Sequence, residues 1–150
     1  MYDSIHQLID WNEYSRQPLT EDQIECYKDY LNWYLISRNQ TLSESFIERH
    51  KNRVHWESIS QYQTLSEPFI KRHKDSVDWH AISQYQTLSE PFIEQHQHQV
   101  DWRLISRYQT LSEPFIERYK ACVNWNWICI KQRLSESFIE RFQTFIHDHN

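Results

Sequence analysis

The sequence predicts an all-α fold, a solenoid of short αα-hairpin repeats, and three observations support this. Leucine recurs every 23 residues from Leu19 to Leu134, and tryptophan keeps the same step from Trp33 to Trp125. Apolar side chains within a repeat follow the spacing of a helical stripe and not the alternation of a strand. Glycine, which average usage would place about ten times in a chain of this length, is absent from the 150 residues. Self-similarity at such a period is typical of repeat architectures.

The first helix of each repeat has a marked start, as in the unit LSEPFIKRHKDSVDWHAISQYQT. Thr64 with Glu67 three residues later matches a capping box, and Ser66 is a competing cap. Pro68 fits only in a first helical turn. The pattern therefore predicts a helix over about residues 65–74.

The second helix of the repeat follows after a short turn. Asp75 and Ser76 supply that turn, and Asp78 or Ser76 can cap a helix over about residues 79–86. Two helices of about two turns each form an αα-hairpin. One such hairpin buries too little apolar surface to fold alone, so we expect order only in an array whose neighbours share a core.

We expect one repeat domain over residues 1–150, built from five full units and two partial ones. Phe142, Phe145 and Ile146 extend the last helix beyond the usual unit and predict a cap over the final exposed face. The segment 10–18 has the same role at the front. The partial units are 1–18 and 134–150, and the full units are 19–41, 42–64, 65–87, 88–110 and 111–133.

A leucine-rich repeat is the main alternative for units of this length. That class needs an alternating L-x-L strand with its asparagine, and the sequence has none. The proline of the LSEPFI segment would also interrupt a strand ladder. The helical interpretation is therefore preferred.

The composition excludes several classes of function. Phosphate loops, dinucleotide fingerprints and the nucleophile elbow depend on glycine, which the chain lacks. The net charge of -5 argues against a nucleic-acid partner, which requires clustered Lys and Arg. No apolar run is long enough for a membrane span, and the three cysteines fit no disulfide framework. These features favour an intracellular, cytoplasmic protein.

The motif LSEPFI, followed by VDW and then ISQYQT, resembles the short tandem repeats found in many copies in proteins of large DNA viruses and some phages. The resemblance covers nearly the whole chain. It implies a viral or phage origin, hence a host-cell cytoplasm, and an interaction role, and it transfers no catalytic residues. The first unit departs most, with Gln23 in place of phenylalanine and Asn39 in place of tyrosine.

The titratable residues give no pattern of catalysis or metal binding. His50, His73 and His96 share one repeat position with tyrosine and phenylalanine in other units, which indicates a packing site. Copies in successive units lie about one helix diameter (~10 Å) apart, too far to share a metal ion. The repeated serine, glutamine and glutamate positions suit helix ends and turns. We therefore expect no enzyme, no metal and no cofactor or small-molecule substrate.

Candidate partner-binding residues lie where repeats differ from one another. The residue after each tryptophan varies, and the unit 111–133 carries an extra tryptophan next to that position. Near the front, tyrosines gather with acidic residues. Aromatic residues of this kind are typical interface anchors, although end capping and surface drift remain alternatives. The candidates are Tyr27, Tyr30, Tyr34, Glu57, His80, Arg103, Asn126 and Trp127.

The sequence thus favours a non-catalytic scaffold that binds a partner protein, such as a host factor that a viral protein blocks. One alternative is an acidic mimic of nucleic acid, because residues 1–41 carry seven acids against three bases. Mimicry predicts binding that weakens steeply with salt and needs the acidic front, at Glu21, Asp22, Glu25 and Asp29. A second alternative is a structural protein that forms a homodimer through its C-terminal helix.

Overall fold

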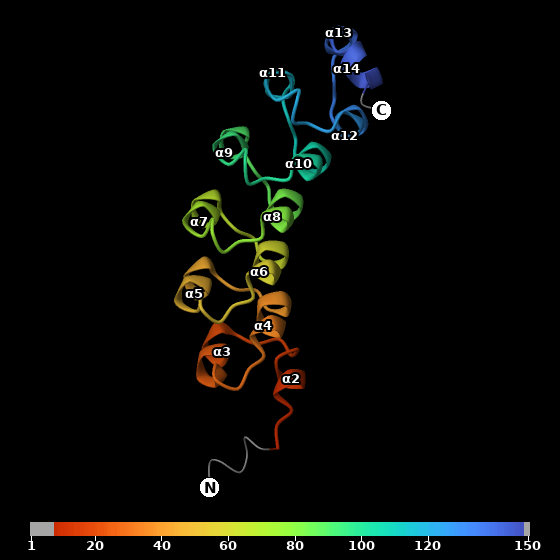
Figure 1. Ribbon diagram of the computed structural model, residues 1–150. Helices are drawn as coiled ribbons and strands as arrows, with labels where there is room; N and C mark the ends of the chain where they lie inside the picture. Colours follow the sequence, from red (N-terminus) through yellow and green to blue (C-terminus); the bar gives the residue numbers. More distant parts are fainter. Residues whose placement is uncertain (1–7, 149–150) are drawn as a thin grey trace. The chain divides into compact units, whose positions relative to one another are not determined.

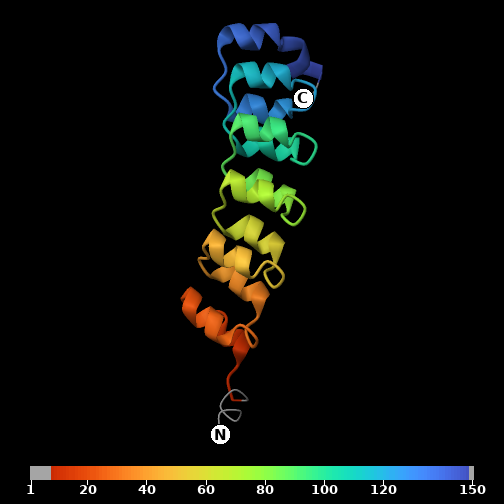
Figure 2. The same cartoon turned by 90° about the vertical axis from the view of Figure 1, so that its left-hand side faces the viewer.

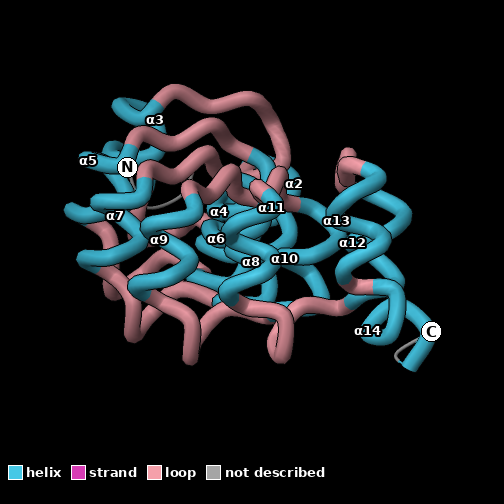
Figure 3. Tube along the Cα trace, turned by 90° about the horizontal axis from the view of Figure 1, so that it is seen from above, coloured by secondary structure: helices cyan, strands magenta, loops and turns pink. Residues whose placement is uncertain are grey.

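The computed structural model describes residues 8–148, and over this range it contains thirteen helices and no strand. Figure 3 shows that the described chain consists of helices joined by loops. The helices recur with the 23-residue step of the sequence. The predicted all-α class of short helical repeats is confirmed.

Each repeat begins with a short helix, here called the A helix, that starts at a glutamate. These glutamates lie 23 residues apart, from Glu21 to Glu136. The A helices are α3 (Glu21–Tyr27), α5 (Glu44–Arg49), α7 (Glu67–Arg72), α9 (Glu90–Gln95), α11 (Glu113–Arg118) and α13 (Glu136–Arg141).

Each repeat ends with a second helix, the B helix, that starts at the repeated tryptophan. Asp, Asn or His precedes the tryptophan as the N-cap; Asp78, for example, accepts a hydrogen bond from the backbone N–H of Ala81 at 2.6 Å. The B helices are α4 (Trp33–Asn39), α6 (Trp56–Tyr62), α8 (Trp79–Tyr85), α10 (Trp102–Tyr108) and α12 (Trp125–Lys131), preceded by the shorter α2 (Trp11–Tyr14).

The chain divides into two compact units, residues 1–77 and 78–150. In the first unit, α3, α5 and α7 lie on one side and α2, α4 and α6 on the other (Figure 1). In the second unit, α9 and α11 face α8, α10 and α12 in the same manner. Figure 2 shows the helices within each unit stacked roughly parallel to one another. Neighbouring B helices pack directly, α4 on α6 and α8 on α10 on α12.

The core of each repeat comes from the apolar stripe that the sequence predicts. In the repeat from Leu65, the side chains of Phe69, Ile70, Val77 and Ile82 are buried. The repeated tryptophans are only half-buried, except for Trp125. Their indole N–H groups donate to a carbonyl five residues earlier, as Trp102 does to Gln97 at 3.0 Å. The indole N–H groups are thus satisfied within the repeat, as is usual for tryptophans that are largely buried.

The predicted start of the A helix was two residues early. Ser66 is the N-cap, and its side chain accepts a hydrogen bond from the backbone N–H of Phe69 at 3.3 Å. Pro68 lies in the first turn, as expected. The helix ends at Arg72, with His73 as its C-cap, and not near residue 74. The capping-box geometry occurs only at Thr20 and Gln23 among the helices described.

The two ends of the chain carry helices outside the regular pattern. At the front, α2 stacks on α3 through Trp11, whose ring centroid lies 5.6 Å from that of Tyr27. Residues 1–7 of the predicted N-terminal partial unit lie outside the described range. At the other end, α14 (Gln143–Asp148) follows α13 directly and packs on α12. Phe142 and Phe145 cover Trp125 there, which is 1% exposed.

Candidate functional site

The repeated glutamine at the end of each B helix connects one repeat to the next. The side-chain amide of Gln63 donates to the carbonyls of Ser37 (3.0 Å) and Gln40 (2.7 Å) in the preceding repeat. Its side-chain oxygen accepts the backbone N–H of Leu42 at 2.9 Å. One buried side chain thus forms three hydrogen bonds to backbone groups around the turn that ends the preceding repeat. Gln40, Gln109 and Gln132 repeat the arrangement.

The repeated serine and glutamate have the same structural purpose. The hydroxyl of Ser37 donates to the carbonyl of Trp33 at 2.7 Å and accepts the backbone N–H of His55 in the next repeat at 2.9 Å. Glu44 accepts the backbone N–H of Ser66, also in the next repeat, at 2.6 Å. The repeated glutamine, serine and glutamate form the framework between repeats, so their repetition needs no catalytic explanation.

The histidine column is a packing site, as its exchange with aromatic residues predicts. The ring of His50 lies between Trp33 (4.9 Å between centroids) and Phe46 (4.5 Å) and is 8% exposed. Its Nε2 lies 2.7 Å from a carboxylate oxygen of Glu25. Hydrogen bonds from Lys28 and then His50 lower the pKa of Glu25.

The same ring position recurs with other partners along the chain. His73 Nε2 lies 2.6 Å from a carboxylate oxygen of Glu48, whose pKa His73 and then Lys51 lower. Tyr119 takes the position in a later repeat and donates its hydroxyl to Glu94 at 3.1 Å. Burial, followed by this bond, raises the pKa of Tyr119. Over the described residues, no group of three or more His, Cys, Asp or Glu side chains is arranged to hold a metal ion.

The tyrosines near the front divide into packing and surface residues. Tyr27 is half-buried against Trp11, which indicates an end-packing role. Tyr30 stacks on Trp11 at 5.0 Å but remains 49% exposed. Tyr34 is 44% exposed, and its hydroxyl lies 3.0 Å from the guanidinium of Arg38, whose pKa this bond raises.

The variable residues after each tryptophan all lie on the exposed side of the B helices. Glu57 in the first unit and His80, Arg103 and Asn126 in the second are exposed. Because α8, α10 and α12 pack side by side, the last three form a row across neighbouring helices. His80 Nδ1 lies 3.3 Å from a carboxylate oxygen of Asp101.

Trp127 lies beside a residue that the sequence analysis did not single out. The guanidinium of Arg107 stacks over the Trp127 ring at 4.1 Å and over the Tyr108 ring at 4.9 Å. Tyr108 and its repeat equivalents Tyr62 and Tyr85 are between 43% and 49% exposed. The sequence did contain a signal for these surface tyrosines, because tyrosine recurs at this position in three repeats. From the sequence alone, the position is placed within the second helix of the repeat and not in a binding surface.

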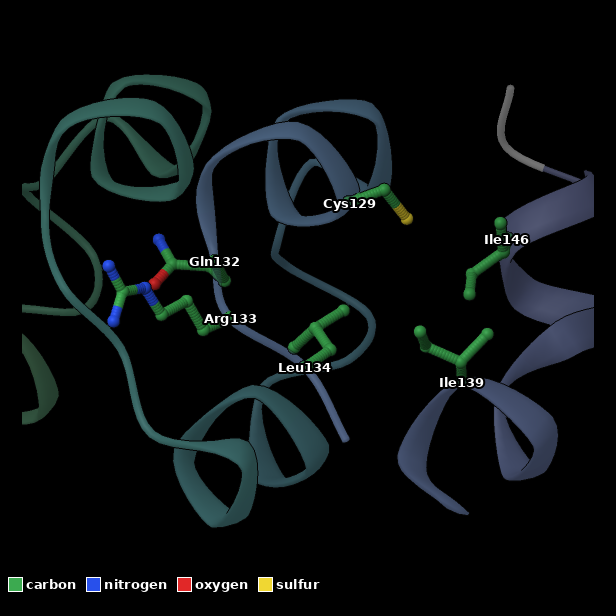
Figure 4. A pocket seen from close by; sticks show the side chains of 6 residues that line it. All are labelled: Cys129, Gln132, Arg133, Leu134, Ile139 and Ile146. Atoms are coloured by element: carbon green, nitrogen blue, oxygen red, sulfur yellow. The ribbon is translucent and has the colours of Figure 1, made fainter. Parts of the chain in front are cut away.

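A shallow groove of about 500 Å³ lies at the C-terminal end of the second unit. Figure 4 shows Cys129, Leu134, Ile139 and Ile146 around one space, with Arg133 directed away from it. Ile139 is 44% exposed, whereas its repeat equivalent Ile116 is fully buried. Desolvation raises the pKa of the Cys129 thiol. The groove thus exposes repeat positions, such as that of Ile139, that are buried in the preceding repeats.

The fold and these surfaces define an α-helical repeat protein of the solenoid class, with a buried framework between repeats and a variable exterior on the B helices. No helix of the described residues is both long and apolar enough to cross a membrane. The chain matches no known family model, and neither a curated protein nor a solved structure matches it.

Proposed function

We propose that this chain is a non-catalytic repeat scaffold that binds a partner protein through the outer surface of its B helices. The observation that carries the proposal is the contrast between the two faces of these helices. The inner face holds fully buried isoleucines and the repeated hydrogen bonds, whereas the outer face displays exposed aromatic and varied residues. We call the latter the B-helix surface, comprising the exposed residues Tyr34, Glu57, Tyr62, His80, Tyr85, Arg103, Tyr108 and Asn126 together with the half-buried Trp127.

The structural setting of this surface suits recognition. Tyrosine and tryptophan offer large contact areas with little side-chain freedom to lose, and they dominate the energetics of many interfaces. The backbone beneath them is held by hydrogen bonds between repeats, such as those of Gln109 to Ser83 and Gln86. A preformed surface lowers the ordering cost of association. Within each unit, neighbouring B helices add the same positions side by side, so the partner can contact more than one repeat there.

The acidic-mimic alternative has less support from the contacts at the front of the chain. Glu25 bonds Lys28 at 2.6 Å and His50 at 2.7 Å, and Asp29 lies 2.7 Å from a guanidinium nitrogen of Arg53. Glu21 accepts the backbone N–H of Ser43 at 2.6 Å. Glu25 and Asp29 are thus paired with basic side chains and Glu21 serves a contact between repeats, which weakens the case for a free acidic surface.

Affinity capture from the native cell tests the proposal. The full chain should retain a partner that Tyr34→Ala and Trp127→Ala each release, because truncating an interface anchor weakens binding by about 30-fold or more. The control variant, Gln95→Ala with Glu140→Ala, removes exposed side chains from two A helices and should retain the partner. Circular dichroism must show the same helix content in all variants.

The salt dependence of the same capture separates the two hypotheses. Binding through aromatic anchors should survive an increase from low to physiological salt. The mimic hypothesis predicts the opposite results. Binding would then vanish with salt, and Tyr34→Ala would have no effect. Binding would also be lost on neutralising the acidic front, at Glu21, Asp22, Glu25 and Asp29. The idea that the partner is a host factor blocked by a viral protein rests only on the tandem-repeat resemblance.

A structural, self-associating role is a second candidate, and the C-terminal groove favours it. Ile130 (68% exposed) and Ile139 (44% exposed) are large apolar side chains at this end of the second unit. The groove is lined by Leu134 and Ile139, whose equivalents in the preceding repeat, Leu111 and Ile116, are buried. A second copy could cover it, which would make the C-terminal helices part of a homodimer interface.

A further inference from the structure

A second pocket of the structure has a strongly basic lining. It occupies about 350 Å³ beside the C-terminal ends of α10 and α12. Arg107, Lys131 and Arg133 line it together with Tyr108 and the turn after α10, and no acidic residue takes part. The chain as a whole has a net charge of -5. Three cations at one pocket of an acidic protein form a local exception, here called the basic pocket.

Two of the three cations are departures from the repeat pattern. Lys131 occupies the position of Tyr62, Tyr85 and Tyr108, and Arg133 occupies that of Thr64, Thr87 and Thr110. Since three other repeats fold with tyrosine and threonine there, packing does not require a cation. Both side chains are exposed. The substitution of two neutral residues by two cations in one repeat therefore concerns the surface and not the core.

The cations of the basic pocket have no carboxylate partner among the described residues. Arg107, Lys131 and Arg133 form no ion pair within residues 8–148, whereas Arg53, Arg118 and Arg141 each contact an acidic side chain. A helix C-terminus attracts cations, but only by a few tenths to one kcal/mol at a surface. The carbonyls of Ser106 and Gln109 there already accept the side-chain amide of Gln132.

The guanidinium of Arg107 is also held in a defined position. It stacks over Trp127 at 4.1 Å and over Tyr108 at 4.9 Å. Neither ring accepts a conventional hydrogen bond, and among the described residues the guanidinium N–H groups of Arg107 donate to no other side chain, so they are available to a ligand. These are the groups that bind carboxylates in paired hydrogen bonds. The arrangement offers a fixed guanidinium and two further positive charges beside an exposed phenol ring.

We propose that the basic pocket binds the carboxylate side chains of an acidic peptide segment in the partner protein. This deepens the proposed function, on which it rests, by naming the chemistry of the partner at one end of the B-helix surface. Nucleic acid fits less well, because its regularly spaced phosphates require a wide basic surface, and the other repeats carry tyrosine and threonine at two of these positions. The Tyr108 ring adds a contact for an apolar residue within the segment.

A titration of the ¹⁵N-labelled chain of 150 residues with acetyl-(Glu)₄-amide at low salt tests this proposal directly. The expected result is a set of saturable amide shifts at residues 107–111 and 131–133. The double variant Lys131→Tyr with Arg133→Thr restores the residues of the other repeats, so it should fold. Its affinity for the peptide should fall at least about tenfold, because two charge-assisted contacts are lost.

Lys71→Glu is the matched control. It also restores a repeat residue, the one found at Glu48, Glu94 and Glu117. It changes the net charge by -2 (+1 to -1), as the double variant does by losing two positive charges. The control should bind the peptide nearly as well as the original chain. Equal loss in both variants would mean that only the overall charge matters and would overturn the proposal.

Further titrations show which chemical group the basic pocket recognises. No saturable shifts with acetyl-(Glu)₄-amide, or the same shifts with acetyl-(Gln)₄-amide, would contradict carboxylate recognition. Inorganic phosphate that binds the pocket as tightly as the peptide would show a small-anion site instead. None of these outcomes depends on cellular capture, so failure of the basic pocket and failure of the Tyr34→Ala test can be told apart.

Discussion

At the scale of single residues, the histidine column shows how one repeat position is stabilised in several ways. His50 and His73 each have Nε2 within 2.7 Å of a glutamate oxygen, and Tyr119 bonds a glutamate through its hydroxyl. His96 differs, because its Nε2 is buried without a hydrogen-bond partner in the described structure. The residue 25 positions before it in the sequence is Lys71, where His73 has Glu48 and Tyr119 has Glu94.

His96 is therefore a site where an apolar ring should improve stability. Its Nδ1 lies 2.8 Å from Oε1 of Gln99, so the Nδ1–H donates to this oxygen and Nε2 is left as a buried acceptor. His96→Phe removes that acceptor while keeping the ring between Trp79 and Phe92. Phe142 already occupies the same repeat position. We expect the free energy of unfolding to rise by about 1 kcal/mol in urea denaturation.

His73→Phe is the matched comparison for this prediction. The same substitution at the same repeat position removes the contact with Glu48, so the free energy of unfolding should fall. If both variants shifted stability in the same direction, the unpaired Nε2 of His96 would not be the relevant difference between the two sites.

At the scale of helices, the sequence predicted the elements well and their starts less well. Both helices of the repeat, the proline in the first turn and the Asp78 cap are present as expected. The Thr64–Glu67 capping box is not present. Glutamate side chains at the first helical position instead accept hydrogen bonds from the backbone of the next repeat, as Glu44 does from Ser66. A local pattern of residues does not reveal a bond to a neighbouring repeat.

The two candidate caps of α7 can be compared by mutation. Ser66→Ala removes the acceptor of the Phe69 N–H and the bond to Glu44, and should lower the free energy of unfolding by about 1 kcal/mol. Thr64→Ala alters an exposed side chain and should change it by less than about 0.5 kcal/mol. Urea denaturation followed by circular dichroism measures both. A larger loss from Thr64→Ala would restore the capping-box interpretation.

The same limit explains which parts of the candidate surface were missed. The position after each tryptophan could be predicted as exposed, because the residue found there differs from one repeat to the next. The basic pocket could not, because Arg107 and Lys131 lie in different repeats and only packing of α10 on α12 brings these helices together. The repeated glutamine was correctly assigned to the turn, but the turn that it completes belongs to the preceding repeat.

At the scale of the whole molecule, the last repeat of the second unit is covered less completely than the repeats before it. The backbone N–H of Leu134 has no hydrogen-bond partner in the described structure, whereas that of Leu111 donates to Gln132 at 3.0 Å. Leu134 is half-buried and Ile139 is exposed, whereas Leu111 and Ile116 are buried. Helix α14 covers Trp125 but leaves the groove between these residues open.

An open apolar face of this kind predicts self-association. Exposed apolar surface favours pairing of like patches, and two copies that share one patch form a closed dimer. The mass measured by light scattering should rise above 18.7 kDa as concentration increases. Ile139→Gln should return it to the monomer value, because the amide would be buried without a partner at the dimer interface. Leu8→Gln changes an 86% exposed leucine at the other end of the chain and should leave the association intact. A constant monomer mass for the unmodified chain at all concentrations would show that α14 alone is a sufficient cap and that the groove is not a dimer contact.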